Sequence, residues 1–166
     1  MRTLAQYALN VSYNTINNNN GGGSNHPNIL RGIYTNTAAE AGETIRYNTI
    51  SLKGGGTSQA IAGIENAAGS GASANAINIT SNSIINSTYT TATTGGFYGI
   101  KNSGAPASLA ITDNNISNST FTGTTGFFYG IFNSGAASTA SINTNTFSGN
   151  STADPTTGLF CGIYNN

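Results

Sequence analysis

The chain has 166 residues, of which five are Lys or Arg and five are Asp or Glu, so its formal net charge is zero at pH 7. Charged residues make up 6% of the sequence, whereas about 25% is usual in soluble domains. Nucleic acids and anionic membrane surfaces attract clustered positive charge, which this sequence lacks, and we therefore exclude both as principal partners. The single Cys excludes a disulfide framework and a Cys-based zinc site.

Hydrophobic residues make up 37% of the chain and aromatic residues 9%, which is enough apolar material for a narrow core. We therefore expect one folded domain over residues 1–166 and not a disordered chain. No apolar run reaches the length of a transmembrane helix, so we expect no membrane insertion. Low charge with abundant Asn, Thr and Gly favours an extracellular or cell-surface location. Because Met1–Tyr7 lacks the apolar segment of a signal peptide, we interpret the sequence as a fragment or as having an assigned start.

The first motif along the chain is an aliphatic residue, two spacers, Asn, one further spacer, and then Ile or Phe. It occurs five times with unchanged internal spacing, and its copies are Val11–Ile16, Ile45–Ile50, Ile79–Ile84, Ile111–Ile116 and Ile142–Phe147. The two apolar ends lie five residues apart, so a straight strand would point them to opposite faces. If both point inward, the chain bends between them. We expect the bend at Asn, which tolerates the left-handed conformation better than other non-Gly residues.

Stacked at successive turns, these Asn residues would form an amide ladder. The predicted ladder consists of Asn14, Asn48, Asn82, Asn114 and Asn145.

The second motif is an apolar residue, one spacer, Gly-Ile, and an Asn shortly afterwards. The five Asn residues are Asn36, Asn66, Asn102, Asn133 and Asn165. Gly in this position allows a bulge, which lets the apolar residue before it and the Ile after it both face the core. The predicted core stack formed by the leading residues is Leu30, Ile61, Phe97, Phe128 and Phe160.

The two motifs alternate strictly, and each recurs every 31–36 residues. The connections between them vary in length: the Gly-Ile isoleucine follows the first motif by 14–17 residues and precedes the next by 11–15. Constant corners with adjustable loops are typical of a solenoid, in which every turn returns to the same place. The motif segments are rich in Ile, Thr, Tyr and Phe and show no helical periodicity, so we predict an all-β solenoid.

These repeats resemble those of the right-handed parallel β-helix proteins, the pectate-lyase-like superfamily, over nearly the whole chain. The resemblance implies about five coils of three strands each, with the Asn ladder at the short second turn. The low-charge composition also resembles repeat regions of bacterial surface proteins and adhesins. Such a fold specifies architecture and not activity.

The family includes polysaccharide lyases and hydrolases, whose acidic sites do not carry over to this chain. Glu40 and Glu43 share one predicted loop, Asp154 lies in a turn, and Asp113 precedes a ladder Asn, where it would face solvent. Glu65 and Lys101 occupy equivalent positions in adjacent coils, about 4.8 Å apart, and we interpret them as a surface ion pair in preference to a catalytic pair. We interpret His26 as a loop residue and Cys161 as unreactive, and we predict no catalytic residue, cofactor or metal site.

Two surface patterns suggest binding. Tyr34, Phe132 and Tyr164 share the outward column of Glu65 and Lys101, which makes them a candidate ligand strip for sugars. Asn-Ser-Thr triplets begin at Asn86, Asn118 and Asn150; a flat array of Thr could bind ice, although no regular Thr column runs through all coils.

We therefore expect a non-catalytic structural or adhesive solenoid whose partners are further copies stacked end to end, or flanking coils of a longer chain. The alternative is a protein that binds surface polysaccharide, or degrades it with catalytic residues outside this segment.

Overall fold

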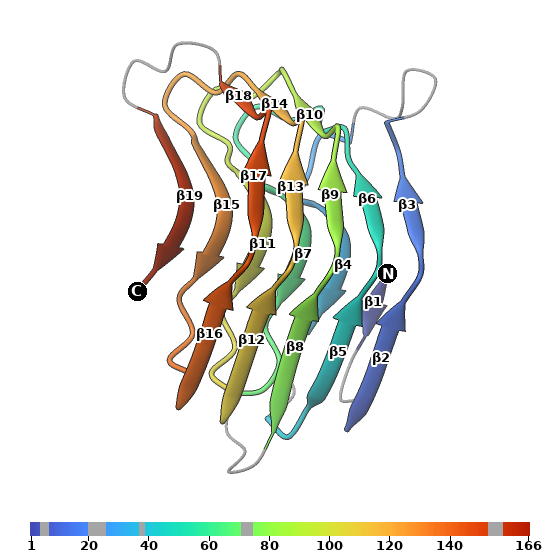
Figure 1. Ribbon diagram of the computed structural model, residues 1–166. Coiled ribbons are helices and arrows are strands. Elements are labelled where there is room, and N and C mark those ends of the chain that lie inside the picture. The colour runs from blue at the N-terminus through green and yellow to red at the C-terminus, as the bar shows by residue number, and fades with distance from the viewer. Residues whose placement is uncertain (4–6, 20–25, 37–38, 71–74, 153–157) are drawn as a thin grey trace.

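Parallel sheets stacked into a solenoid make up the whole described structure (Figure 1). The computed structural model describes residues 1–3, 7–19, 26–36, 39–70, 75–152 and 158–166, and these ranges contain strands and no helix. Every strand pairs in parallel with a strand from the neighbouring coil. The all-β solenoid predicted from the repeats is therefore confirmed.

Three long sheets and one short sheet form the walls. Sheet A contains β1 (Arg2–Thr3), β4 (Leu30–Thr35), β7 (Ile61–Asn66), β11 (Phe97–Asn102), β15 (Phe127–Asn133) and β19 (Leu159–Asn165). Sheet B contains β2 (Ala8–Ser12), β5 (Gly42–Arg46), β8 (Ala76–Thr80), β12 (Ser108–Thr112) and β16 (Thr139–Asn143). Sheet C contains β3 (Thr15–Asn17), β6 (Thr49–Ser51), β9 (Ser83–Ile85), β13 (Asn115–Ser117) and β17 (Thr146–Ser148). Sheet D contains β10 (Thr88–Tyr89), β14 (Thr120–Phe121) and β18 (Ser151–Thr152).

Sheets B and C lie next to each other on one side of the coil, and sheet A forms the opposite side (Figure 1). The chain passes from B through the short corner to C and then returns along A. Five stacked strands are joined by four turns, so the five copies of the first motif give a solenoid of about four turns. The right hand of the coil stays a prediction.

The short corner between sheets B and C differs in one detail from our expectation. The residue with positive φ is the one before each ladder Asn, with φ between 53° and 60° at Tyr13, Tyr47, Ser81, Asp113 and Thr144. The prediction that Asn itself adopts the left-handed conformation is therefore wrong. The preceding residue makes the bend and points its side chain outward, which leaves the Asn side chain free to turn into the ladder.

A second corner follows sheet C in the later coils. Asn86, Asn118 and Gly149 have positive φ there, at 54°, 54° and 62°. Ser151 pairs with Thr120, so the third Asn-Ser-Thr triplet is displaced by one residue from the first two. The triplets therefore do not stack as a regular array, which removes the basis for a flat Thr surface at this position.

The Gly-Ile motif forms the predicted bulge in sheet A. In β11, Phe97 and Ile100 are both buried although they lie three residues apart, and the strand pairing omits Gly99 between them. A Cβ atom at Gly99 would lie 2.5 Å from the carbonyl oxygen of Gly130 and 2.9 Å from Cγ1 of Ile116. Gly is therefore required because the next coil and sheet C both approach the backbone closely.

The predicted core stack is continuous along sheet A. Ile61, Phe97 and Phe128 are fully buried, and Leu30 is half-buried against the same core. The Phe97 and Phe128 rings stack with their centroids 4.8 Å apart and an interplanar angle of 4°. For Phe128 and Phe160 the centroid distance is 4.7 Å and the interplanar angle is 10°. Phe160 ends the column and is 48% exposed. The column therefore stops on a ring whose outer side is open.

Replacing Gly99 with Ala should destabilise the protein by about 1–3 kcal/mol, the usual cost of overpacking a filled site. Gly162 is the matched control, since a Cβ there meets nothing nearer than Phe147 at 3.8 Å. Chemical denaturation of both variants measures the difference. An equal effect of Gly99→Ala and Gly162→Ala would contradict the close-approach explanation.

Candidate functional site

The predicted Asn ladder runs the length of the corner between sheets B and C. In each coil, both the backbone N–H and the side-chain Nδ2 of one Asn donate to Oδ1 of the Asn in the next coil. For Asn48 and Asn82 these distances are 3.1 and 2.9 Å, and for Asn82 and Asn114 they are 2.9 and 3.0 Å. Asn48, Asn82 and Asn114 are each 1% exposed. The ladder is therefore confirmed, and all its amides point the same way along the axis.

Each ladder amide also binds the backbone of sheet B. Nδ2 of Asn82 donates to the carbonyl oxygens of Ile45, in the preceding coil, and of Thr80, in its own coil, at 2.8 and 3.1 Å. Asn114 repeats the pattern with Ile79 and Thr112. One side chain therefore joins three successive coils, which explains why this position admits only Asn among the described residues.

A second amide ladder, which the sequence analysis did not predict, runs along the end of sheet A. Nδ2 of Asn66 donates to Oδ1 of Asn102 at 2.7 Å, and the same bond joins Asn102 to Asn133 and Asn133 to Asn165 at 2.7 and 2.6 Å. In the preceding coil the position belongs to Thr35, not to Asn36, and Oγ1 of Thr35 donates to Oδ1 of Asn66 at 2.6 Å. The recurring Asn of the second motif was the signal that could have revealed this ladder.

The outer face of sheet A carries two neighbouring columns of side chains. The strand register places Tyr34, Glu65, Lys101, Phe132 and Tyr164 in one column, as predicted. The other column contains Arg31, Ala62, Tyr98, Tyr129 and Cys161. The face is therefore ionic near β4 and β7 and aromatic from β11 to β19.

The ionic part is an ion-pair triad centred on Glu65. Lys101 Nζ lies 3.0 Å from Oε1 of Glu65, and Nε of Arg31 donates to Oε2. Burial opposes ionisation of Glu65, which is 8% exposed, but the hydrogen bonds and charges of Arg31 and Lys101 outweigh burial and lower the pKa of the carboxyl. Arg31 was not predicted as a partner, because it lies one column away. The two cations bind both carboxylate oxygens of Glu65 and leave the triad with a net positive charge.

The aromatic part comprises Tyr98, Phe127, Tyr129, Phe132 and Tyr164, hereafter the aromatic strip. The rings of Tyr98 and Tyr129 stack with a centroid distance of 5.7 Å and an interplanar angle of 14°. Those of Phe132 and Tyr164 stack at 5.1 Å and 5°. Burial, with Tyr129 and the charge of Glu65, raises the pKa of Tyr98 to about 12. These rings therefore pack against one another along the axis.

Tyr34 is separated from the aromatic strip by the triad. The Arg31 guanidinium lies 4.3 Å from its ring centroid, and its hydroxyl donates to Oδ1 of Asn36 at 2.7 Å. The candidate ligand residues Tyr34, Phe132 and Tyr164 thus share a column, but they do not form one continuous surface. Phe127, Tyr98 and Tyr129 are the members of the strip that the motif spacing did not single out.

Glu43 occupies a core position, contrary to the prediction of a loop residue. It lies in β5, paired with Leu9 and Ile77, and is 4% exposed. Burial raises the pKa of Glu43, and a hydrogen bond with Thr35 offsets this only in part. Oε2 has no hydrogen-bond partner among the described residues.

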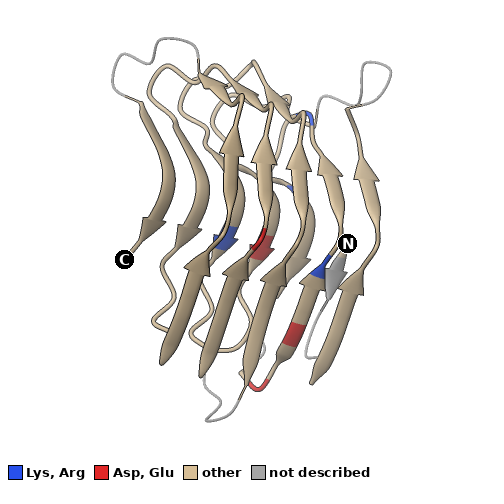
Figure 2. Cartoon of the chain, in the orientation of Figure 1, with Lys and Arg blue, Asp and Glu red and all other residues tan. Residues whose placement is uncertain are grey.

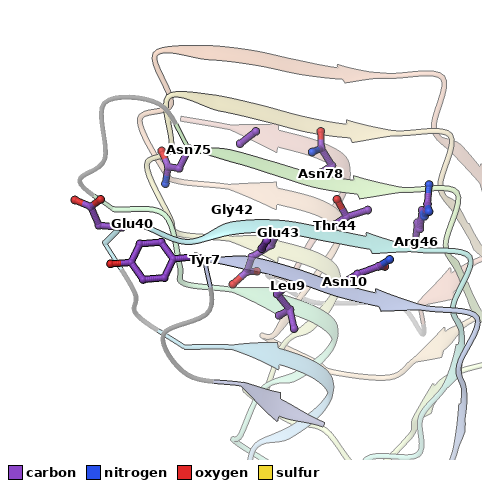
Figure 3. Close-up of a pocket in the computed structure, with 12 residues that line it drawn as sticks. Tyr7, Leu9, Asn10, Glu40, Gly42, Glu43, Thr44, Arg46, Asn75 and Asn78 are labelled. Carbon is purple, nitrogen blue, oxygen red and sulfur yellow. The ribbon is translucent and has the colours of Figure 1, made fainter.

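A groove of ≈ 530 Å³ lies at β2, β5 and β8 of sheet B (Figure 3). Tyr7 and Glu40 lie at one end of the groove and Arg46 at the other, with Asn10 and Thr44 between them. Nε of Arg46 is buried and has no hydrogen-bond partner among the described residues. Glu43 borders the groove, but its hydrogen bond to Thr35 turns its carboxyl into the coil. The groove therefore offers amides, a hydroxyl and a guanidinium, and not two facing carboxylates.

The remaining titratable residues lie apart from one another. Asp113 is exposed and accepts a hydrogen bond from Thr144 Oγ1 at 2.6 Å. The backbone of His26 bridges to Gly54, and Cys161 Sγ contacts the carbonyl oxygen of Ile163 at 3.1 Å. Asp154 lies outside the described residues. Within the described part of the chain, no three His, Cys, Asp or Glu side chains come together as a metal site would require.

Charged residues are few along the described part of the chain (Figure 2). After Asp113 the sequence contains one charged residue, Asp154. The last coil therefore ends on uncharged strands, where Leu159, Phe160 and Ile163 are 49%, 48% and 43% exposed. These residues and Tyr164, on β19, together with Ile142 and Phe147, are hereafter the C-terminal end face.

No protein-family model matches the chain, and comparison with curated proteins and with solved structures finds no match either. In the part of the chain that the structure describes, no helix is long and apolar enough to span a membrane.

Replacing Asn82 with Ala should destabilise the protein by about 3 kcal/mol, because several buried backbone groups lose their partners at once. Asn14→Ala is the control, since Asn14 is exposed and no described ladder amide donates to it. Urea denaturation compares the two variants. A loss as large for Asn14→Ala as for Asn82→Ala would contradict the cooperative role of the ladder.

Glu43 should make the protein less stable as pH rises. Its pKa is raised in the folded state, so its stabilising contribution is complete below its unfolded pKa, near 4.5, and is lost as pH rises through the folded pKa. Glu65 acts oppositely, because its lowered pKa gives stability that is lost as pH falls.

We expect Glu43→Gln to remove the loss of stability that occurs as pH rises. At pH 7 the variant should be more stable than the wild type by on the order of 1–3 kcal/mol, the usual cost of a buried unpaired group. Thermal unfolding between pH 4 and 8 measures this. Glu40→Gln is the control, because Glu40 is exposed. An unchanged pH profile in Glu43→Gln would show that the carboxyl does not control it.

Proposed function

We propose that this protein is a non-catalytic structural solenoid of the cell exterior, which associates through its ends and serves in a filament or an adhesive surface layer. The observation that carries the proposal is the C-terminal end face, where core columns continue to the last coil and stop with Phe160 and Ile163 about half exposed. Such columns are apolar inside the solenoid, and an exposed apolar patch of this kind marks an interaction surface.

The unpaired strand edges support the same conclusion. β16, β17 and β19 each pair with a preceding strand and have no described strand on their other side. Open edges present unpaired N–H and C=O groups that bind further strands. The described C-terminal edge has no Lys or Glu to oppose such pairing, so association of coils is the function that fits this surface best.

The extracellular and bacterial-surface parts of the proposal rest on composition. Low charge with abundant Asn, Thr and Gly supports them, as does the resemblance to the right-handed parallel β-helices, which the amide ladder at the short corner strengthens. On this proposal the chain needs no cofactor.

Electron microscopy and sedimentation test the proposed function. Wild-type protein should form end-to-end assemblies whose mean length grows with concentration, and Phe160→Lys should abolish them, since it places a charge in the column. Asn143→Lys is the control, because Asn143 is exposed on the outer side of β16 in the same coil. A wild-type chain that sediments as a monomer at all concentrations would contradict the proposal.

Carbohydrate binding is a second candidate, favoured by the polar groove beside Arg46. Its amides and guanidinium are groups that bind hydroxyls and carboxylates. The stacking of the aromatic strip argues against sugar binding there, because sugars pack on ring faces and each ring of the Tyr98–Tyr129 and Phe132–Tyr164 pairs has one face against its partner. Retardation of the wild-type chain in gels that contain polysaccharide, together with a monomeric state, would favour this alternative over the filament.

A further inference from the structure

We propose that the C-terminal end face binds the N-terminal coil of a second copy of this chain, head to tail, and that β19 of the first copy takes the place of β1 in the second. This inference rests on the proposed end-to-end association. It adds the polarity and the register of the contact, and it identifies β1 as the strand that is displaced.

The direction of the amide ladder sets the polarity. Each ladder Asn donates toward the C-terminal end and accepts from the N-terminal end. The backbone N–H of Asn145 in the last coil has no acceptor among the described residues, and no described group donates to Oδ1 of Asn14 in the first coil. Donors therefore meet acceptors when the C-terminal end of one copy lies on the N-terminal end of another. Two C-terminal ends would bring donors against donors.

The apolar columns agree with the same arrangement. Continuing the sheet B register would place Ile142 of one copy beside Val11 of the next. In sheet C, Phe147 would pair with Ile16. Ile142, Phe147 and Ile16 are only half-buried in the single chain. Head-to-tail contact would therefore bury these three side chains against apolar residues, as the equivalent side chains of the inner coils are buried.

Sheet A has one more strand than sheets B and C, and this decides what happens to β1. Six strands form sheet A and five form sheet B. If β16 of one copy pairs with β2 of the next, β19 of the first reaches the slot beside β4 that β1 already occupies. Only one of the two strands can pair there.

β19 is the better partner for β4. It has seven residues and β1 has two. β1 pairs only with Tyr34 and Thr35, and no described strand pairs with Leu30 and Arg31 on that side. β19 in the same slot would place Phe160 on Leu30 and Tyr164 on Tyr34, the pairings found in every other coil. The N-terminal strand is held in this slot by two hydrogen bonds, from Met1 N to Gly32 O at 3.0 Å and from Tyr34 N to Met1 O at 2.9 Å. β1 therefore competes with assembly.

Disulfide trapping distinguishes the polarities. Asn10 and Ser141 are exposed in the same outward column, at the first and last strands of sheet B. Within one chain they lie four strand spacings apart, about 19 Å, too far for a disulfide. In a background of Cys161→Ser, the double variant Asn10→Cys/Ser141→Cys should form a series of covalent multimers on oxidation, and neither single variant should form covalent multimers.

Covalent dimers of Ser141→Cys alone would show tail-to-tail contact, and covalent dimers of Asn10→Cys alone would show head-to-head contact. Either result would overturn the proposal. Filaments that form without covalent multimers of the double variant would overturn the register while leaving the proposed function intact. If wild-type protein forms no assemblies by microscopy, the proposed function itself fails, and the two failures are thus distinguishable.

Removal of residues 1–3 tests the displacement of β1. A chain that starts with Met before Leu4 should assemble at a concentration about tenfold or more below that of the wild type, because two or three hydrogen bonds no longer have to be broken. Arg2→Ala is the control, since it makes the same change in side-chain charge and keeps the strand. Assembly that is unchanged or weakened by the deletion would show that β1 does not compete with β19.

Discussion

Each coil of this protein must lie one strand spacing above the last with its side chains in register, and the interaction that enforces this is the amide ladder at the corner of sheets B and C. Hydrogen bonds between strands would tolerate a slip in register, but a buried amide that binds the coils on both sides does not. The ladder therefore fixes the position of the corner in every coil. The bulges of sheet A, the apolar columns and the stacked rings all follow from this fixed repeat.

The ladder also explains how a chain with so little charge satisfies its polar groups. Asn provides two donors and one acceptor oxygen in a neutral side chain, so a buried column of Asn completes its hydrogen bonds without the cost of burying ions. The ion-pair triad around Glu65 and the carboxyl of Glu43 are the exceptions. The first is balanced by two cations, and the second lies in a column otherwise formed by Leu9, Ile77, Leu109 and Ala140.

The repeat in the sequence was sufficient to predict the architecture, the main ladder, the bulge at Gly and the outward column of Tyr34, Glu65 and Lys101. It was insufficient where neighbouring positions compete for one role. The bend lies before Asn14 and not at it, because a residue cannot both turn the chain outward and direct its amide inward. The charge of Glu43 predicts a loop residue, but its position two residues before Ile45 places it on the inner face of the strand by alternation. The second ladder is not evident from the sequence because the recurring Asn of the first copy, Asn36, lies one residue beyond the ladder column. The strand register places Thr35 in that column, beside Asn66.

The loops between the motifs vary in length while the corners do not, and this difference separates two kinds of sequence change. A substitution at a ladder Asn, or at a sheet A Gly that the next coil covers, alters the neighbouring coils. An insertion in a connecting loop leaves the rise per coil unchanged, because the loop leaves and rejoins the stack at the same two places. The outer surface of such a protein is therefore free to diversify in evolution, coil by coil, on an interior that stays constant.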